Sequence, residues 1–401
     1  MLLSPTLNLR FVLIALTLIW LISFPAKGVF FQFSLYLLPV LVLAFRQTRL
    51  LLKRDSSVIL LLSVSLALPL FLSELWALIV NGGALSSDPF DVFWRLAMFP
   101  VVLAAACDYS RFSIRKLQSS LVLFAVIYGL AGIGSSLLHL SLNGRNVGWR
   151  ATGLISNSNP FGFLMIAAAL ISFQRLLRAV TKKEALAFML AVVLLLVAGV
   201  LSGSRSALLG GVLSLALLLV LQRESLISFL GDKKKIWIFG GAVTLFLVSL
   251  LLLQMGYLDQ LQGRILKAFS GDIRLQIWQH YLGLVSENPF LGIPHSAENR
   301  FFYHGKMHGP HNMYLSALVH SGIVGLAGLL IGLGWLVKRI ICSVNTNKHL
   351  CLALLLLLCL FCFFNSSLFG NEMTQGVFAF IVAMILSRES SVEKGLSSPS
   401  A

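Results

Sequence analysis

The chain has 401 residues, of which 58% are hydrophobic and only 11% charged, and its mean hydropathy is +0.89. So few charged side chains cannot cover a water-exposed surface, and the composition therefore excludes a soluble globular protein and a disordered chain. The 31 Lys and Arg residues exceed the 15 Asp and Glu residues and give a formal net charge of +16, which fits either nucleic-acid binding or the basic cytoplasmic loops of a membrane protein.

Apolar runs of about 20 residues, the length that crosses a bilayer, recur along the chain. They predict an all-α polytopic membrane protein with about twelve transmembrane helices. The first, sixth and last runs are short or have polar flanks, which leaves eleven or ten helices open. The predicted spans are residues 11–26, 29–45, 58–80, 90–107, 117–138, 159–177, 185–202, 205–222, 236–255, 311–337, 349–369 and 372–387.

The basic residues alternate in number from one connector to the next. With the N-terminus inside, the cytoplasmic connectors and tails carry 21 of the 31 Lys and Arg residues, so we expect both termini in the cytoplasm. These residues are dispersed over several loops, and nucleic acid is therefore not an expected partner. The ten on the outward side are Lys27, Arg95, Arg145, Arg150, Arg205, Arg264, Lys267, Arg274, Arg300 and Lys306.

The longest connector divides the predicted organisation into four parts. Residues 1–255 hold helices one to nine, 256–310 form a periplasmic loop, 311–387 hold helices ten to twelve, and 388–401 form a cytoplasmic tail. Apolar residues at helical spacing after Ile273 predict an amphipathic helix that Asn288–Pro289 ends. We therefore expect a small helical cap over the bundle.

Histidines concentrate in and beside this loop, and six of the eight lie between His280 and His320. The spacing of His304, His308 and His311 is compatible with zinc. However, the segment between them is broken by glycine and proline, and the sequence contains no HExxH or DxD pattern. We expect no metal and no cofactor, with a zinc site as the alternative and solvated loop histidines as the simplest interpretation.

His311 stands apart because it follows Pro310 and precedes Asn312 and a long apolar run. Proline favours the first turn of a helix, so the imidazole is expected at the outer end of the tenth span. An imidazole with an ordinary pKa near 6.5 can accept a proton at neutral pH, which makes His311 a candidate general base. A capping residue at the membrane interface is the alternative.

Three outward arginines form a second group of candidates. Arg205 lies in the tight connector LSGSRSALLGG between two predicted spans, at or just inside the outer membrane–water interface, where an arginine is costly. Arg274 begins the predicted cap helix, and Arg150 precedes a turn at the sixth span. A guanidinium group binds phosphate through paired hydrogen bonds, so these residues predict a polyanionic ligand. Lipid head-group contacts, or an ion pair such as Arg205 with Glu372, are the alternatives.

These residues resemble motifs of the O-antigen ligases. His311–Asn312, followed after nine residues by GIVG, resembles the signature H-[NSQ]-x9-G-x-x-[GTY]. SGSRSAL resembles the short outward arginine motif of that family, and DIRLQIWQHYLGLVSENPFLG resembles the second one. RATG and NSNP in the fifth connector, and the large loop before the tenth span, also fit. O-antigen polymerases and bacterial O-oligosaccharyltransferases share versions of these motifs, but the latter usually carry a larger outward domain.

The resemblance implies a metal-independent, inverting glycosyl transfer in lipopolysaccharide biosynthesis, at the periplasmic face of the bacterial inner membrane. The donor would be O-antigen polysaccharide on undecaprenyl diphosphate, and the acceptor a sugar hydroxyl of lipid A–core. Arg205 and Arg274 would bind the diphosphate, and His311 would be the general base. Arg150 and Asn312 are secondary candidates for substrate binding. Membrane lipids are the remaining expected partners, and no cofactor is implied.

Two other functions stay open. The first is an O-antigen polymerase, in which another lipid-linked repeat unit is the acceptor. The second is a transporter of lipid-linked oligosaccharide, for which inverted repeats and helices broken near the midplane are typical. We find no repeat, and the polar candidates cluster at the outer face, so the sequence favours an enzyme. The motif spacing and the modest cap favour a ligase over a polymerase.

Overall fold

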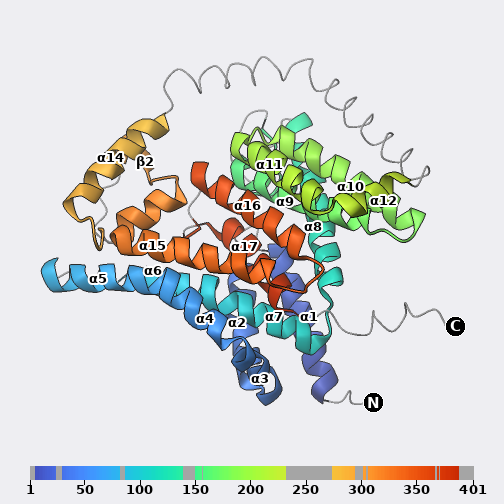
Figure 1. Ribbon diagram of the computed structural model, residues 1–401, viewed down its shortest axis with the longest axis horizontal. Coiled ribbons are helices and arrows are strands. Elements are labelled where there is room, and N and C mark those ends of the chain that lie inside the picture. The colour runs from blue at the N-terminus through green and yellow to red at the C-terminus, as the bar shows by residue number, and fades with distance from the viewer. Residues whose placement is uncertain are drawn as a thin grey trace.

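The structure is a computed structural model that describes residues 5–23, 29–81, 86–138, 150–155, 157–231, 273–293, 301–303, 306–365, 368–369 and 371–387. Figure 1 shows helices packed side by side, with a β-hairpin near α14 at one end. The helices are α1 (Pro5–Ser23), α2 (Val29–Ala44), α3 (Arg46–Arg54), α4 (Ser56–Leu62), α5 (Leu68–Asn81), α6 (Asp88–Val92), α7 (Phe99–Ser110), α8 (Ile114–Leu137), α9 (Ser158–Leu177), α10 (Lys182–Leu201), α11 (Arg205–Leu221), α12 (Arg223–Gly231), α14 (Ile273–Glu287), α15 (Met313–Ile341), α16 (Lys348–Phe364) and α17 (Glu372–Leu386). Two π-helical segments, η1 (Ser63–Ala67) and η2 (Phe93–Met98), interrupt the third and fourth spans, and strands β1 (Phe301–Tyr303) and β2 (Lys306–His308) pair antiparallel.

The described helices indicate a multi-pass membrane protein. Six of them are long and apolar enough to cross a membrane, or up to eight if each of two bent helix pairs is one span. Shorter apolar helices, among them α16 and α17, accompany these six. Each predicted span coincides with a helix except 236–255, which lies outside the described residues. The count of about twelve spans therefore stays a prediction.

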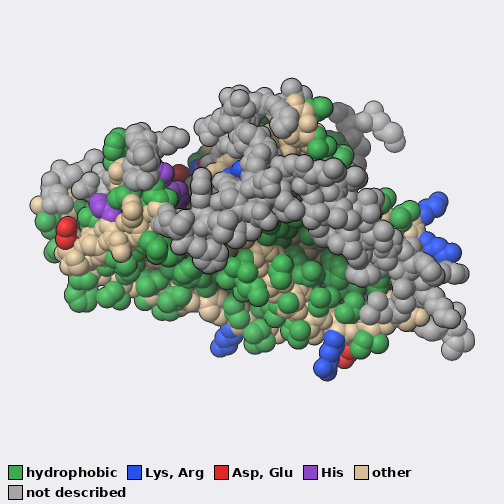
Figure 2. All heavy atoms as spheres, turned by 90° about the horizontal axis from the view of Figure 1, so that it is seen from above, with side chains coloured by type: hydrophobic (Ala, Val, Ile, Leu, Met, Phe, Trp, Pro, Cys, Tyr) green, Lys and Arg blue, Asp and Glu red, His purple; other side chains and the backbone are tan. Residues whose placement is uncertain are grey.

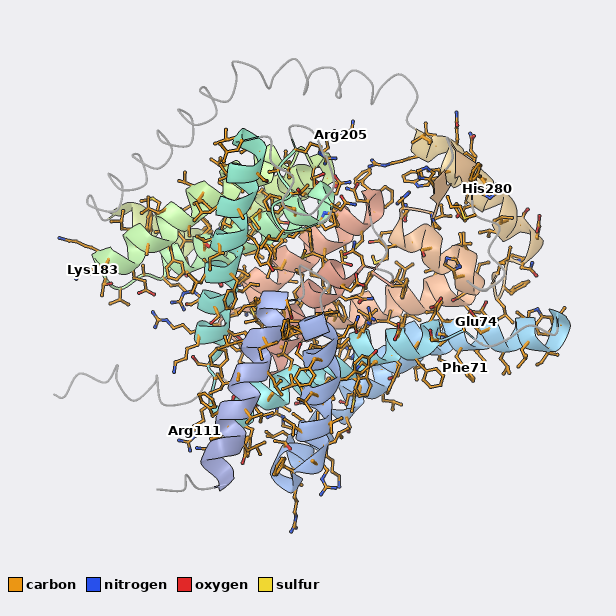
Figure 3. The ribbon with its side chains drawn as sticks, turned by 180° about the vertical axis from the view of Figure 1, so that it is seen from behind. Phe71, Glu74, Arg111, Lys183, Arg205 and His280 are labelled. Atoms are coloured by element: carbon orange, nitrogen blue, oxygen red, sulfur yellow. The ribbon has the colours of Figure 1, made fainter. Side chains whose placement is uncertain are left out.

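The surface of the bundle is apolar, as a lipid-facing surface must be. Figure 2 shows hydrophobic side chains along the lower part of one face, with several Lys and Arg side chains at its lower and right-hand margins. Exposed side chains such as Leu60, Ile79 and Val220 keep 66%, 70% and 69% of their surface accessible. In Figure 3, Lys183 and Arg111 lie on the far side of the bundle from His280, and this separation is compatible with the predicted orientation.

Helix α9 forms the centre of one half of the bundle. Of the most apolar window of this helix, 94% is buried inside the protein, and α8, α10, α11 and α16 pack around it. An apolar surface on every side suits a helix surrounded by other helices. Small residues allow this close packing: a Cβ at Gly162 would lie 2.2 Å from the Ser202 hydroxyl in the turn after α10.

Helix α15 contains a break that receives part of the cap. Gly322 has φ +61° and ψ −159°, which is not helical, and the loop after α14 fills the break. The Ile293 amide donates to the Val319 carbonyl at 2.7 Å, and the Ile323 amide donates to the Pro289 carbonyl at 2.8 Å. Backbone groups freed by the break are thus satisfied within the protein, as membrane depth requires. The apolar run predicted one continuous helix over residues 311–337, and this break was not predicted.

The cap agrees with the predicted small helical cap in one feature and differs from it in another. The predicted amphipathic helix is confirmed as α14, which ends at Glu287 just before Asn288–Pro289. The β1–β2 hairpin was not predicted, and it lies in the loop segment for which only helical structure was expected. Figure 1 shows α14 and β2 at the end of α15 where that helix begins.

Candidate active site

The turn between α10 and α11 places Arg205 at the beginning of α11. Helix α10 ends at Leu201, and Gly203 makes the turn with φ +61°, a backbone conformation that suits glycine. Arg205 follows as the first residue of α11, and its side chain is exposed. Figure 3 shows Arg205 at the end of the helix group that faces α14. Arg205 therefore lies in a tight turn between two helices, as predicted.

The Arg150 segment is bound to the same turn. The Ala151 amide donates to the Leu201 carbonyl at 2.9 Å, and Arg150 Nε donates to the Ser202 carbonyl at 2.7 Å. Arg150 Nη2 also donates to Asn159 Oδ1 at 2.7 Å, at the beginning of α9. Arg150 and Arg205 thus belong to one compact group of loops and helix ends.

Arg274 enters from the cap. It is the second residue of α14, as the sequence predicted, and its Nη2 donates to Asn365 Oδ1 at 3.0 Å. Aromatic contacts hold this helix near the end of α16, because the rings of Trp278 and Phe363 meet edge to face with centroids 5.8 Å apart. The cap therefore brings Arg274 to the end of the bundle.

His311 lies in a strained segment between the hairpin and α15. Its φ of +48° is unusual for a residue other than glycine, and such strain is frequent at functional sites. Two side chains of α14 hold the segment: Trp278 Nε1 donates to the Pro310 carbonyl at 3.1 Å, and the Tyr281 hydroxyl donates to the His308 carbonyl at 2.7 Å. One helix thus positions both Arg274 and His311.

The surroundings of His311 keep its imidazole in the neutral, proton-accepting form. Although the side chain has an exposed surface, desolvation by the surrounding protein lowers its pKa, and the positive charges of His308 and Arg274 lower it further. A backbone hydrogen bond with Asn365 acts in the opposite direction. The rings of His308 and His311 have centroids 5.9 Å apart. This environment suits a general base at neutral pH.

Asn312 has a different place from the one expected for a substrate-binding residue. It is buried and caps α15, because its Oδ1 accepts from the Tyr314 amide at 2.9 Å and from the Leu315 amide at 3.1 Å. The helix therefore begins at Met313, and Pro310 lies before the helix rather than in its first turn as predicted. The observed contacts make Asn312 a residue that fixes the end of α15 next to His311.

Asn365 connects the candidate residues and was not predicted from the sequence. The predicted eleventh span ran to residue 369, but α16 ends at Phe364 and Asn365 is its C-cap. Asn365 Oδ1 accepts from Arg274 and, at 3.1 Å, from Asn159 Nδ2, and Asn365 Nδ2 donates to the Ser206 hydroxyl. The signal that could have found it is the polar run Asn-Ser-Ser at the end of an apolar segment.

The amide of Asn365, next to His311, therefore connects the three arginines. It binds Arg274 directly, Arg150 through Asn159, and the first turn of α11, which begins with Arg205, through Ser206. Helix N-termini and guanidinium groups both attract anions. Such a site can bind a phosphate group and at the same time present a neutral imidazole to a hydroxyl. The Asn365 network is the geometric basis for treating these residues as one site.

The alternatives from the sequence are placed as follows. Glu372, considered as a partner of Arg205, lies 3.8 Å from Arg95. His304, one of the three histidines considered for zinc, lies outside the described residues. In the described part of the chain, no group of three or more His, Cys, Asp or Glu side chains is arranged to hold a metal ion.

Part of the chain is similar to a known protein family. Residues 190–330 match the sequence model of the family Wzy_C, described as O-antigen ligase. This range includes Arg205, Arg274 and His311 but neither Arg150 nor Asn365. A comparison with curated proteins finds no match to the chain. Residues 190–330 are thus similar to a family that covers O-antigen ligases and polymerases, and this likeness supports an enzymatic role of that general kind.

Proposed function

We propose that the protein is an O-antigen ligase. It transfers O-antigen polysaccharide from undecaprenyl diphosphate to a sugar hydroxyl of lipid A–core, at the periplasmic face of the bacterial inner membrane. The observation that carries this proposal is the meeting of Arg150, Arg274, the first turn of α11 and His311 around Asn365. The family match and the apolar helices agree with a lipid-linked donor.

In the proposed reaction, Arg205 and Arg274 bind the diphosphate of the donor. Their positive charge stabilises the negative charge that develops on the leaving undecaprenyl diphosphate. Arg150 adds a third guanidinium group, which Asn159 and the Ser202 carbonyl hold in place. These cationic side chains supply the charge that a divalent metal supplies in many nucleotide-sugar transferases, so the proposed transfer is independent of metal and of any cofactor.

His311 acts as general base in this proposal. Its neutral imidazole takes the proton of the acceptor hydroxyl while the oxygen attacks the anomeric carbon from the side opposite the diphosphate. The new glycosidic bond forms as the anomeric carbon–oxygen bond to the diphosphate breaks, and the configuration at that carbon inverts. Undecaprenyl diphosphate leaves as an anion, and the proton remains on His311 until water removes it. Desolvation and nearby positive charge lower the pKa of His311, so its imidazole is neutral and able to accept a proton at neutral pH.

A deletion strain analysed by lipopolysaccharide gel tests the reaction class. Loss of a ligase leaves unsubstituted lipid A–core together with polymer that remains on its lipid carrier. Core that carries a single repeat unit would instead assign the polymerase reaction, in which the acceptor is a lipid-linked repeat unit. Normal smooth lipopolysaccharide in the deletion strain would contradict both. Complementation with the wild-type chain controls for effects on neighbouring genes.

A further inference from the structure

The side-chain amide of Asn365 both accepts and donates hydrogen bonds. Oδ1 accepts from Arg274 Nη2 at 3.0 Å and from Asn159 Nδ2 at 3.1 Å, and Nδ2 donates to the Ser206 hydroxyl. An amide oxygen has two acceptor positions, and both are occupied here.

Each partner of this amide is either one of the arginines or a neighbour of one of them. Arg274 is bound directly, Ser206 follows Arg205 in the first turn of α11, and Asn159 accepts from Arg150. These contacts bridge 91, 159 and 206 residues of sequence. The amide is therefore the point where the cap, α9 and α11 are joined at one end of the bundle.

We propose that Asn365 is a positioning residue that holds Arg150, Arg205 and Arg274 at fixed distances from one another so that together they bind the diphosphate of the donor. This inference rests on the proposed function and adds to it a residue outside the matched range 190–330. A prearranged set of charges binds a diphosphate better than mobile side chains do, because the charges need no reorganisation on binding.

The neutrality of the amide is part of this role. A carboxylate has the same shape and accepts from Arg274 and Asn159 equally well, and the Ser206 hydroxyl can rotate to donate to it. The carboxylate would also place a negative charge next to the Arg274 guanidinium, where the diphosphate has to bind. Asn365→Asp therefore changes the charge of the bridge while keeping most of its hydrogen bonds, and Asn365→Ala removes the bridge.

Asn371 offers a matched control for the charge change. It lies in the same connector and caps α17, where its Oδ1 accepts from the Met373 amide at 3.0 Å and from the Thr374 amide at 3.4 Å. Aspartate caps a helix as well as asparagine does, so Asn371→Asp adds the same charge without loss of a cap. A shared effect of the two variants would reflect charge in the connector, and a difference reflects the position of residue 365.

The test measures binding of undecaprenyl diphosphate in detergent micelles to the purified full-length chain. We expect the Kd to rise about ten-fold with Asn365→Asp, from the Coulomb energy of one added charge, and severalfold with Asn365→Ala, while Asn371→Asp stays within about two-fold of wild type. In transfer assays we expect the two Asn365 variants to raise the donor KM more than they lower kcat, and Asn371→Asp to resemble wild type. A lower kcat with unchanged KM and Kd would indicate a merely structural role and overturn the inference.

Two further outcomes separate this inference from the proposed function. If the wild-type chain does not bind undecaprenyl diphosphate, the proposed function fails. If wild type binds and both Asn365 variants bind equally well, the function stands and the inference is overturned. Should the Asn365 variants unfold, as judged from Tm in detergent, Ser206→Ala decides instead. Ser206→Ala removes the acceptor of Asn365 Nδ2, so we expect its Kd to be severalfold higher than that of wild type. An unchanged Kd would contradict the proposal.

Discussion

Arg274 on α14 donates a hydrogen bond to Asn365 at the end of α16, with 3.0 Å between Nη2 and Oδ1, across 91 residues of sequence. This contact seats the cap on the bundle. Tyr314 of α15 and Trp278 of α14 add aromatic contacts with Phe363, with ring centroids 5.9 Å and 5.8 Å apart. The cap therefore completes the proposed donor site, because it delivers both Arg274 and the support for His311.

The first prediction concerns the geometry of Arg205. Arg205→Lys keeps the charge but loses the planar pair of donors that matches a phosphate. We expect transfer by the purified chain to fall about a hundredfold or more, as for the loss of one donor that stabilises a developing anion. Arg223→Lys, at the beginning of α12, is the matched control and should retain wild-type activity. Full activity of Arg205→Lys would reduce Arg205 to a membrane anchor.

The second prediction concerns the pH dependence of transfer. The neutral form of His311 is active, so the rate falls as the pH drops through the pKa of His311, which lies below its ordinary value. His308→Gln removes one of the charges that lower this pKa. The acidic limb of the pH–kcat profile should therefore move to higher pH, towards about 6.5.

The matched control for this shift is His280→Gln. The His280 ring contacts Tyr281 and Phe301, with centroids 5.2 Å and 5.4 Å away, and His280 is not among the groups that shift the pKa of His311. Its acidic limb should coincide with that of wild type. A profile for His308→Gln that also coincides with wild type, or moves to lower pH, would refute the assignment of His311 as the titrating base.

The third prediction concerns the break in α15. A Cβ at Gly322 would lie 2.2 Å from the carbonyl carbon and oxygen of Phe290, in a backbone conformation with φ +61°. Gly322→Ala should therefore destabilise the protein by about 2–4 kcal/mol. Thermal unfolding in detergent measures the change.

Gly334 provides the control on the same helix. A Cβ there meets nothing within 4 Å, so Gly334→Ala should leave Tm unchanged or raise it slightly, since alanine favours the helix. Equal Tm values for the two variants would mean that the loop after α14 does not fill the break in solution.

The fourth prediction concerns metal. EDTA should leave transfer by the purified chain unchanged, because the proposed site uses guanidinium groups at the diphosphate. Strong inhibition that added zinc reverses would assign a metal role to the histidines of the loop. EDTA saturated with zinc beforehand, at the same concentration, controls for effects of EDTA other than metal removal.

Much of the fold could be predicted from the sequence, because a membrane helix can be recognised from a continuous apolar run of residues. About 20 apolar residues are required to cross the bilayer, and that requirement alone located α8, α10 and α11 to within a few residues. The amphipathic pattern after Ile273 likewise predicted α14. The break at Gly322 was not predictable in this way, because it depends on a loop that approaches from another part of the chain.

The charged residues of the candidate site could be predicted from the sequence, but its neutral polar residue Asn365 could not. Arg205 and Arg274 stand out in an apolar sequence because a charged side chain near the membrane is energetically costly and usually has a function. Asn365 carries no charge and lies at the end of an apolar run, and its importance comes from partners 91 to 206 residues away. The left-handed backbone of His311 depends on contacts with α14, which no local pattern encodes.

The most direct test of the account is the transfer of polysaccharide from undecaprenyl diphosphate to lipid A–core by purified wild type and by His311→Asn. Asparagine tolerates the left-handed backbone at this position but is not a base. We predict that His311→Asn binds undecaprenyl diphosphate as wild type does while its kcat falls by about 10²–10⁴. Wild-type transfer by His311→Asn would contradict the central claim that His311 takes the proton of the acceptor hydroxyl.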